Sequence, residues 1–553
     1  INPKAPILIM TTEVYRNMAL TDDPAISAVS YVVFDEIHYI NDVERGYVWE
    51  ESIIFSKNHV RFLCLSATIP NSREFADWIQ AIKEHKVEVV THDKRSVPLD
   101  CKFYDQELGV STLEDTKKQI DDQAYKYRMG WTRFRGPKPK LNLHISLIKE
   151  IKHQLPCFFF TFSRHRCQEN AVALARQNLF EVNPKIAAYT REKLSDAPKE
   201  INSLKSTRQL RQTLPQGIAF HHAGLIPVIK ELVEDLFSQG LINVLYTTET
   251  FAVGINMPAK TVCFDSLMKY DGINFRYLNS KEYFQIAGRA GRRGIDKKGF
   301  SYAIIERRDF NHEKIKKITT KDTEPIMSQF RLSVNTVLNL IKQHTNKEID
   351  SILCMNFNTF QKYGKTFRTE KKDEIYSTFN NIKKKLIKRG YVKDDKLTEK
   401  GNFASRIYAD EILTGELFAT EFYKDLNDFQ VFMLIACICF EPRSKTEFYS
   451  KYPSKDLNIL RKKIQADSYL QGDARFKQIK NLTALVAPCY RGDSIFEILK
   501  NTSLLEGDII RFFRQLLDRI GQIKKAAKDD KLLNLVGSCE HKIMNSLEEI
   551  DAI

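Results

Sequence analysis

The chain has 553 residues, which is enough for three or four domains that each have their own core. Hydrophobic residues make up 43% of it and charged residues 28%, as is ordinary for a soluble protein. The longest purely apolar stretch, Val431–Phe440, is half of what a bilayer span needs, so it reads as a buried helix and no membrane partner is expected. Basic residues outnumber acidic ones by 85 to 70, and the net charge of +15 fits a nucleic-acid partner or an unspecific basic surface about equally well.

The ten cysteines are scattered and form no C-x-x-C pair, so a structural zinc site is not expected. Free thiols of this kind suit a reducing compartment and predict a cytoplasmic or nuclear location. The sequence opens at Ile1 without a signal-peptide pattern, which suggests a fragment or a processed chain.

Short apolar strands alternate with amphipathic helices through the first 310 residues, and this alternation is typical of parallel sheets covered by helices. A first series of strands is predicted at Ile7–Met10, Tyr31–Phe34, Arg61–Leu65 and Val87–Val90, with helices at Val48–Ser56 and Ser72–Ile82. A second series is predicted at Cys157–Phe162, Ile218–Phe220, Val244–Thr247, Val262–Phe264 and Tyr302–Ile305. Two series predict two α/β domains.

The pattern breaks near Arg95–Leu99, where Pro98 interrupts it, and Thr116–Lys140 reads as a long polar excursion. After Arg308 the strands largely stop. A helix at Asp373–Lys388 that ends before Gly390, followed by a tight turn, predicts a winged helix, and from Asp410 onward the pattern is helical. Residues 311–400 hold 20 basic against 11 acidic residues, which predicts a solvated basic face or a surface that meets nucleic acid.

A pair of carboxylates ends one predicted strand, in the stretch VVFDEIH (Val32–His38). Phosphate ligands bind at the carboxyl ends of strands in open α/β sheets. Asp35 is therefore a candidate ligand of the Mg²⁺ that bridges the β- and γ-phosphates, and Glu36 is a candidate for orienting or deprotonating the attacking water. His38 could couple this site to the next motif.

The neighbouring predicted strand is followed by Leu65-Ser66-Ala67-Thr68. A βαβ unit of this length places the hydroxyls of Ser66 and Thr68 beside the two carboxylates, where they could sense the state of the nucleotide. A helix cap before Pro70 is the plainer interpretation and does not exclude this one.

The second α/β region contains the run from Gln285 to Gly294, QIAGRAGRRG. Arg289 and Arg292 are three residues apart and are expected to project from one helix face. Their guanidinium groups suit the charge that develops on a triphosphate during hydrolysis. A flexible basic tract is the alternative.

In this order, DEIH, SAT and QIAGRAGRRG resemble motifs II, III and VI of the superfamily-two DExH-box helicases. Further stretches resemble motifs Ib, IV, IVa and V, namely MTTEVYRN (Met10–Asn17), FFTFSRHRC (Phe159–Cys167), FHHAGL (Phe220–Leu225) and TTETFAVGINMPAKTV (Thr247–Val262). The form of these motifs, together with the helical C-terminus, is most similar to the superkiller/exosome-cofactor RNA helicases. The resemblance covers residues 1 to about 306 by motifs.

The resemblance implies two RecA-like parallel-sheet domains, the first one incomplete, followed by a winged helix and a C-terminal helical domain. The expected boundaries are 1–98, 99–310, 311–410 and 411–553. The family uses ATP and Mg²⁺, with the metal on Asp35. Expected to face the nucleotide are Asp35, Glu36, His38, Ser66, Thr68, Gly254, Asn256, Gln285, Arg289 and Arg292.

The resemblance also places a nucleic-acid strand along Thr11, Thr12, Glu13, Ser163, Arg164, His222, Thr248 and Thr250. A hairpin around Tyr270-Asp271-Gly272 would act as the strand-separating wedge, or be a plain surface hairpin. Arg511 and Arg514 lie three apart on a predicted helix that lines the channel in relatives, and a structural ion-pair role is an equal alternative for either residue.

Two features depart from the family pattern. The loop G-x-x-x-x-G-K-[ST], which cradles the phosphates, is absent before DEIH, and Gly364-Lys365-Thr366 cannot replace it because Thr359 stands where a glycine is required. We therefore expect this polypeptide alone to hydrolyse ATP negligibly. The winged-helix region also has no room for the large arch of the eukaryotic exosome-cofactor helicases.

The leading prediction is an ATP-dependent RNA helicase, acting 3′ to 5′ on single-stranded or 3′-tailed RNA and feeding an exoribonuclease complex. A DNA helicase of repair uses the same motor residues, and a preference for strands with 2′-hydroxyls would separate the two. A non-catalytic nucleic-acid-binding scaffold is the third hypothesis, and the intact Asp35, Glu36, Arg289 and Arg292 speak against it.

Overall fold

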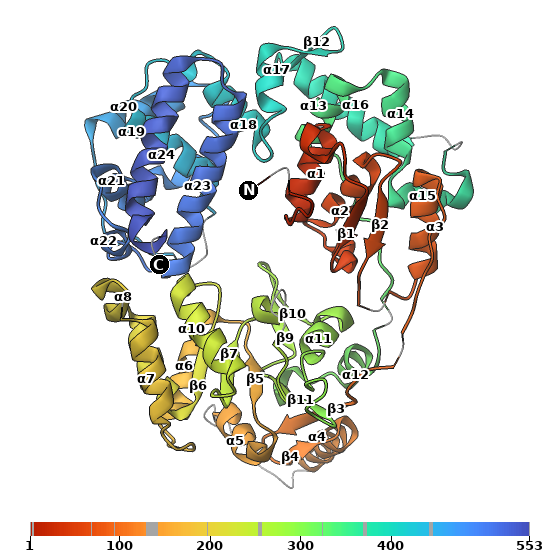
Figure 1. The fold of residues 1–553 in the computed structure, drawn as a ribbon, viewed down its shortest axis with the longest axis vertical. Helices are drawn as coiled ribbons and strands as arrows, with labels where there is room; N and C mark the ends of the chain where they lie inside the picture. Colours follow the sequence, from red (N-terminus) through yellow and green to blue (C-terminus); the bar gives the residue numbers. More distant parts are fainter. Residues whose placement is uncertain are drawn as a thin grey trace. The chain divides into compact units, whose positions relative to one another are not determined.

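The computed structural model describes residues 2, 5–67, 69–92, 94–128, 142–195, 197–252, 257–322, 324–368, 373–441 and 446–551. The chain divides into two compact units, and the division does not follow the sequence in order (Figure 1). The first unit combines Ile1–Val90, Pro325–Leu504 and Ile509–Glu548. The second consists mainly of Thr91–Glu324 and takes in the short stretch Leu505–Asp508.

The α/β part of the first unit contains two parallel strands, β1 (Tyr31–Phe34) and β2 (Arg61–Cys64), in the register that pairs Phe34 with Cys64. Its helices are α1 (Thr12–Leu20), α2 (Gly46–Phe55) and α3 (Ser72–Lys83). Their apolar faces meet in a core around Trp78 and Ile53, to which Phe357 of the later segment also belongs. The predicted strands and helices are confirmed here to within two residues.

Two predicted strands of the first series are wrong. Neither Ile7–Met10 nor Val87–Val90 forms a strand. Ile9 is 93% exposed and Val90 is 92% exposed. A strand needs a neighbour to complete its backbone hydrogen bonds, and among the described residues β1 and β2 pair only with each other. Apolar content alone was therefore a misleading signal.

The winged-helix part of the first unit packs around a core of its own. The helices α13 (Val334–Gln343), α14 (Asn346–Cys354) and α16 (Asp373–Lys388) cover this core, together with the short α17 (Glu399–Ala404). The strand pair β12 (Val392–Lys393) and β13 (Lys396–Leu397) is antiparallel. The predicted helix and the tight strand pair after it are both confirmed.

The remainder of the first unit is helical, as predicted. Its helices are α18 (Glu411–Phe418), α19 (Asp428–Cys439), α20 (Lys455–Ala466), α21 (Ile479–Arg491), α22 (Ile495–Leu499), α23 (Glu506–Ala526, except its first turn) and α24 (Asp530–Asp551). The apolar run lies in α19, which is buried on all sides between its neighbours. Within the described part of the chain, every helix is too short or too polar to cross a membrane.

The second unit is built on a seven-stranded sheet with the order β4-β3-β11-β8-β5-β7-β6. All neighbours are parallel except β4 and β3. The strands are β3 (Leu99–Asp105), β4 (Gly109–Ser111), β5 (Cys157–Phe160), β6 (Ile218–His221), β7 (Val244–Thr247), β8 (Thr261–Phe264) and β11 (Gly299–Ile304). The second series of strands is confirmed, with β3 and β4 added at one edge.

Helices flank this sheet. They are α4 (Leu113–Arg128), α5 (Leu143–Glu150), α6 (Arg164–Ala175), α7 (Pro184–Lys193), α8 (Lys199–Ser203), α9 (Lys205–Thr213), α10 (Pro227–Ser238), α11 (Ser280–Ala287) and α12 (His312–Thr320). The polar excursion at Thr116–Lys140 is in part this α4, and its later residues lie outside the described ones. The hairpin of β9 (Met268–Tyr270) and β10 (Phe275–Tyr277) stands apart from the sheet.

Candidate nucleotide and nucleic-acid sites

The acidic pair stands where β1 ends. Asp35 is exposed, and its Oδ1 accepts a hydrogen bond of 3.0 Å from the backbone N–H of Glu36. Glu36 adopts a left-handed conformation with φ of 52°. Such a conformation is strained for a residue other than glycine, and it occurs most often where a side chain must be aimed. The turn is held because the N–H of Ile37 donates to the carbonyl of Leu65 at the end of β2.

His38 and Ser66 lie beside this pair, as their spacing predicted. The Nδ1 atom of the buried His38 lies 3.3 Å from Oε2 of Glu36 and 3.4 Å from Oγ of Ser66. The imidazole ring stacks on Tyr39, which fixes its plane. His38 therefore links the end of β1 to the end of β2. Thr68, predicted to stand in the same place, lies outside the described residues.

The side chains around Asp35 could hold a magnesium ion only if most of its ligands were water or phosphate oxygens. No group of three or more acidic, histidine or cysteine side chains that could hold a metal is present in the described part of the chain. Magnesium is commonly bound through one or two carboxylates, with water and phosphate oxygens completing an octahedron. An exposed carboxylate at a strand end suits that arrangement.

The arginine motif of the second unit is not helical, and the prediction of one shared helix face for Arg289 and Arg292 is wrong. Helix α11 ends at Ala287, and the chain then runs beside Ala259. The N–H of Ala259 donates to the carbonyl of Arg289, and the N–H of Gly291 donates to the carbonyl of Ala259. These bridging bonds replace the helical ones. Gln285 stays on α11 and is half-buried.

Gly291 makes this close approach possible. Its φ is +90°, and a Cβ atom there would lie 2.6 Å from Cγ1 of Val97. Arg95 supports the same loop by donating to the carbonyls of Gly288 (2.9 Å) and Ala290 (2.5 Å). Sequence reasoning missed Arg95. Its place just before a predicted domain boundary gave no signal of this contact.

Arg292 is held by an acidic residue of its own loop. Its Nε and Nη2 donate to the two carboxylate oxygens of Asp296 at 2.8 and 2.9 Å. This contact raises the pKa of Arg292 and lowers the pKa of Asp296. The motif thus presents a fixed guanidinium group. Gly254 and Asn256, predicted at the nucleotide, lie outside the described residues.

A large cavity lies within the first unit, next to the predicted strand-binding motif. Its volume is about 1460 Å³, and it is lined by α1, by the winged-helix part and by α23. Thr11 and Glu13 line it, whereas Thr12 is not among its lining residues. Helix α23 contributes Gln515, Asp518 and Gln522, which share one helix face.

Six cations and five carboxylates line this cavity, and sequence reasoning missed all six cations. Arg16, Arg475 and Arg519 form ion pairs with Glu51 or Asp410, whereas Lys342, Arg406 and Lys525 take part in none of the ion pairs of the described residues. Arg406 donates to the carbonyl of Lys525, which brings the last two together. Partial burial, and after it the charge of Arg406, lowers the pKa of Lys342. Lys342, Arg406 and Lys525 are therefore the cations of this mixed lining that suit an anionic ligand.

Arg511 and Arg514 both belong to helix α23, as predicted, and both are exposed, but neither lines the cavity. Arg511 lies one turn before Gln515 on the same face of the helix. The 3.6-residue period of the helix that carries Arg511 could have pointed to Gln515, Asp518 and Gln522.

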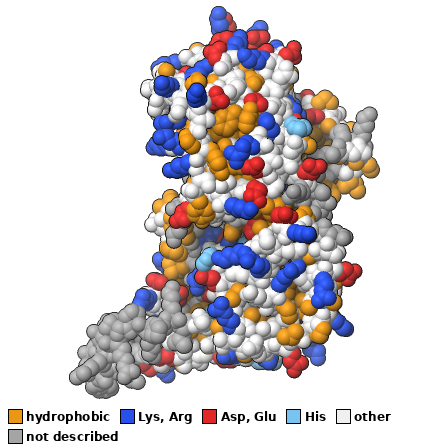
Figure 2. All heavy atoms as spheres, turned by 90° about the vertical axis from the view of Figure 1, so that its left-hand side faces the viewer, with side chains coloured by type: hydrophobic (Ala, Val, Ile, Leu, Met, Phe, Trp, Pro, Cys, Tyr) orange, Lys and Arg blue, Asp and Glu red, His pale blue; other side chains and the backbone are white. Residues whose placement is uncertain are grey.

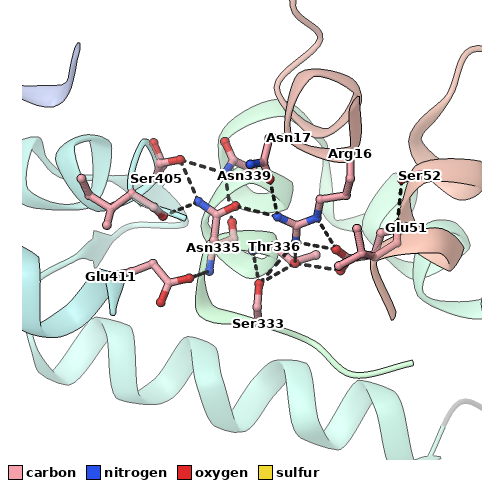
Figure 3. A network of polar contacts seen from close by, with 12 residues as sticks. Arg16, Asn17, Glu51, Ser52, Ser333, Asn335, Thr336, Asn339, Ser405 and Glu411 are labelled. Carbon is pink, nitrogen blue, oxygen red and sulfur yellow. Dashed lines mark hydrogen bonds and ion pairs between the residues drawn. The ribbon is translucent and has the colours of Figure 1, made fainter. Parts of the chain in front are cut away.

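The helix that carries Thr11 is tied to the winged-helix part by a buried network (Figure 3). Arg16 forms an ion pair with Glu51 and donates to Thr336 (2.7 Å) and Asn335 (3.4 Å). Asn335 in turn donates to the carbonyls of Ser405 and Ile407. One guanidinium therefore connects α1, α2 and α13.

Three of the predicted strand contacts of the second unit follow neighbouring strands at one edge of the sheet. Ser163 caps α6 after β5, and Thr248 and Thr250 follow β7, where their hydroxyls lie 3.0 Å apart. They share this edge because β5, β7 and β6 are adjacent and parallel. Hydroxyls at such an edge can donate to phosphate oxygens.

His222, which follows β6, is placed differently. It is fully buried, its Nδ1 accepts from the N–H of Gly224 at 3.2 Å, and its Nε2 lies 3.2 Å from Nε2 of Gln168. Burial, and then the charge of Arg164, lowers the pKa of His222 to about 3. This placement contradicts a direct phosphate contact. Its burial in the sheet could not be inferred from the sequence.

The hairpin of β9 and β10 is anchored by ion pairs. Lys269, whose side chain is 13% exposed, contacts Glu249 at 2.9 Å and Glu282 at 2.7 Å. Arg276 donates to both oxygens of Glu282, which caps the start of α11. Ile273 at the tip is 81% exposed. A hairpin that is firmly anchored and has an exposed apolar tip suits contact with the bases of a nucleic acid.

Three family models match the chain. They are described as the DEAD/DEAH box helicase (residues 1–75), the helicase conserved C-terminal domain (residues 146–294) and the DSHCT (NUC185) domain (residues 394–545). The matches cover the acidic pair, the arginine motif and α23 respectively.

Curated relatives are similar over about two thirds of the chain. The human Superkiller complex protein 2 is 36% identical over 386 residues, which is 65% of this chain and 31% of that protein. The human Exosome RNA helicase MTR4 is 36% identical over 66% of this chain and 36% of its own length. The mRNA transport homolog 4 of Caenorhabditis elegans is 36% identical over 67% of this chain and 38% of its length. The chain thus spans about a third of these relatives.

Proposed function

Because the chain belongs to the DExH-box helicases of the superkiller and exosome-cofactor type, we propose that it provides the motor and the strand-binding parts of an ATP-dependent RNA helicase. The observation that carries the proposal is the acidic pair at the end of β1, in which Asp35 is exposed and Glu36 is half-buried in a left-handed conformation with His38 beside it. The family uses ATP, usually with Mg²⁺.

The residues have separate roles in this proposal. Asp35 would hold the magnesium ion, which supplies charge neutralisation at the phosphates when bound. Glu36 would take the proton of the attacking water, with His38 fixing its orientation. Gln285, Arg289 and Arg292 of the second unit would hold the phosphate groups, and the clamp of Asp296 keeps the guanidinium of Arg292 in one orientation.

The strand would run through the cavity of the first unit, along Thr11 and past Lys342, Arg406 and Lys525. Phosphate contacts of this kind bind any sequence, which suits a translocating enzyme. RNA rather than DNA is supported by the similarity to the human relative MTR4, which is an exosome RNA helicase. Movement from 3′ to 5′ and delivery to an exoribonuclease complex are further parts of the proposal.

The test uses the full-length protein that contains this sequence. ATP hydrolysis and strand displacement are measured on 3′-tailed and 5′-tailed RNA duplexes and on DNA duplexes of the same sequence. Glu36→Gln is expected to lower RNA-stimulated hydrolysis by about a thousandfold, since it removes the general base. Glu44→Gln, an exposed glutamate after the same strand, is the matched control and should keep wild-type rates.

Two outcomes would contradict the proposal. ATP hydrolysis that survives Glu36→Gln would remove the assigned role of the acidic pair. Displacement of DNA as fast as RNA would favour the repair-helicase alternative.

A further inference from the structure

Arg95 holds the backbone of the arginine loop (residues 288–294) on both sides of Arg289. Its Nη2 donates to the carbonyl of Gly288 at 2.9 Å and to the carbonyl of Ala290 at 2.5 Å. Gly288 and Ala290 are the chain neighbours of Arg289. One guanidinium group of the second unit therefore fixes the direction of two peptide carbonyls between which Arg289 lies.

The residues after Arg289 are also enclosed by packing. Val97 is buried, and a Cβ atom at Gly291 would lie 2.6 Å from its Cγ1. The N–H of Gly299 donates to the carbonyl of Pro98 at 2.8 Å, and a Cβ atom at Gly299 would lie 2.7 Å from the carbonyl oxygen of Ala290. The segment that carries Arg95 thus lies directly against the arginine loop and leaves it little room to shift.

The start of α11 is fixed without Arg95. Asn279 and Glu282 form a capping box there, and the hydroxyl of Ser280 donates to the buried carboxylate of Asp322 at 2.8 Å. A carboxylate at this end of a helix is also favoured by the helix dipole. Removal of Arg95 should therefore loosen the loop but leave α11 in place.

The hydrogen bonds of Arg95 are suited to a positioning task. Arg95 is exposed, but a charged donor forms hydrogen bonds about twice as strong as those of a neutral one. A group that acts on a transition state must be held to within about 0.5 Å of its productive position. The side chain of Arg292 is held by Asp296. The backbone that carries Arg289 is held by Arg95.

We propose that Arg95 is a positioning residue of ATP hydrolysis, which acts through Arg289. It keeps the backbone at Arg289 in the one arrangement in which this guanidinium meets the charge that develops on the phosphate groups. This inference rests on the proposed helicase function and adds a residue to it.

The first test measures RNA-stimulated ATP hydrolysis by the full-length protein. Arg95→Met should lower kcat by about tenfold and leave KM for ATP within about twofold, because an interaction made only in the transition state is lost. Arg95→Lys keeps a charged donor that can reach one of the two carbonyls, and it should restore part of the rate. Lys94→Met, which changes the exposed residue directly before Arg95, is the matched control and should keep wild-type values.

The second test separates positioning from a general structural role. Arg95→Met should bind ADP with aluminium fluoride, a mimic of the phosphoryl group in transfer, about tenfold more weakly and should bind ADP alone as the wild type does. The double variant Arg95→Met/Arg289→Ala should be no slower than Arg289→Ala, because Arg95 acts through Arg289.

Four results would overturn the role of Arg95. The first is a wild-type kcat in Arg95→Met. The second is a raised KM with an unchanged kcat, which would mean that Arg95 contacts the nucleotide itself. The third is an equal loss of affinity for ADP with and without aluminium fluoride, which would mean that the change disturbs the fold. The fourth is a pair of single effects that add in the double variant. A wild-type protein without RNA-stimulated hydrolysis would instead defeat the proposed function.

Discussion

Glu50 and Glu51 are adjacent carboxylates of α2 that are both fully buried, and they are satisfied in different ways. Glu51 pairs with Arg16 and accepts from Thr336. The hydrogen-bond donors to Glu50 are all neutral groups: the hydroxyl of Ser328 and the N–H groups of Gln329 and Phe357. A charge buried without a counter-charge is costly, and the charged form of Glu50 is therefore disfavoured.

Burial raises the pKa of Glu50 from 4.5 to about 7, against the lowering effect of its three hydrogen bonds. Between these values the folded state keeps a proton that the unfolded chain has released. Glu50 therefore contributes stability below pH 4.5 that is lost as the pH rises to about 7.

Glu50→Gln should remove this dependence. Relative to the variant, the wild type should lose about 3 kcal/mol of unfolding free energy between pH 4.5 and 8. Guanidinium unfolding, followed by the fluorescence of Trp49 and Trp78 in the same core, measures it. A difference between the two proteins that does not change with pH would contradict the prediction.

The functional importance of Asp35 and Glu36 could be predicted from the sequence, whereas the burial of Glu50 and Glu51 could not, and the difference has a physical reason. Asp35 and Glu36 follow an apolar strand, and the end of a strand has a known place in an α/β sheet. Glu50 and Glu51 lie inside a helix, where glutamate is ordinarily exposed. Their burial depends on residues nearly three hundred positions later, which no local pattern reveals.

At the scale of elements, the network around Arg16 decides how α1 meets the winged-helix part (Figure 3). Removal of one partner from a buried ion pair costs about 3–5 kcal/mol, because the other charge stays buried without compensation. Arg16→Met should destabilise the first unit by this amount at pH 8. Burial already raises the pKa of Glu51, so protonation should reduce the cost at pH 5.

The unfolding free energy of Arg16→Met at the two pH values tests this. The double variant Arg16→Met/Glu51→Gln is the control, and it should recover most of the loss because no charge remains buried. If the double variant were as unstable as the single one, packing rather than charge would explain the effect.

The ion pairs of Lys269 join the hairpin to two other elements, the loop of Thr248–Thr250 and the start of α11. Lys269→Met should loosen the hairpin, which would lower strand displacement several-fold while RNA-stimulated ATP hydrolysis stays near the wild-type rate. The measurement is both rates in the full-length protein, with Lys298→Met as control, since Lys298 pairs with Asp100 on β3 far from the hairpin in sequence. Equal losses in both rates would argue against a role confined to the hairpin.

The bounds of a helix or strand could be predicted where its apolar residues recur with one regular period. The helix at Asp373–Lys388 and the strand at Val244–Thr247 agree with the structure residue by residue. The arginine motif was mistaken for a helix because its end at Ala287 is set by hydrogen bonds to Ala259, about thirty residues earlier. Arg292 then depends on Asp296, and that pairing only becomes visible once the turn is known.

For the whole molecule, the question is where the net charge of +15 acts. Basic and acidic side chains are interspersed over the face in Figure 2, with apolar side chains among them. This face therefore carries no single basic patch. Two other places gather cations: the cavity, with Lys342, Arg406 and Lys525, and the exposed surface of α16, with Lys384, Lys385 and Lys388.

The cations of the cavity and those of helix α16 are expected to contribute differently to RNA binding. Lys342, Arg406 and Lys525 line the same cavity as residues of α1 and α23. A strand in the cavity would therefore contact these three cations together. The lysines of α16 lie on an exposed helix face and, among the described residues, form none of the ion pairs; such a face is ordinarily solvated. We therefore expect the cavity to dominate binding.

The salt dependence of binding separates them. Each phosphate neutralised on a single strand contributes about 0.7 to the slope of log affinity against log salt, so replacing Lys342, Arg406 and Lys525 by glutamine should reduce the slope by about 2. Replacing the three lysines of α16 in the same way removes the same charge and should leave the slope unchanged. The chain of 553 residues is titrated with fluorescent single-stranded RNA at several salt concentrations. An equal reduction of the slope in both variants would mean that RNA binding depends on the total charge of the chain and not on where the cations lie. A reduction in the α16 variant alone would place the strand on the winged-helix surface instead of in the cavity.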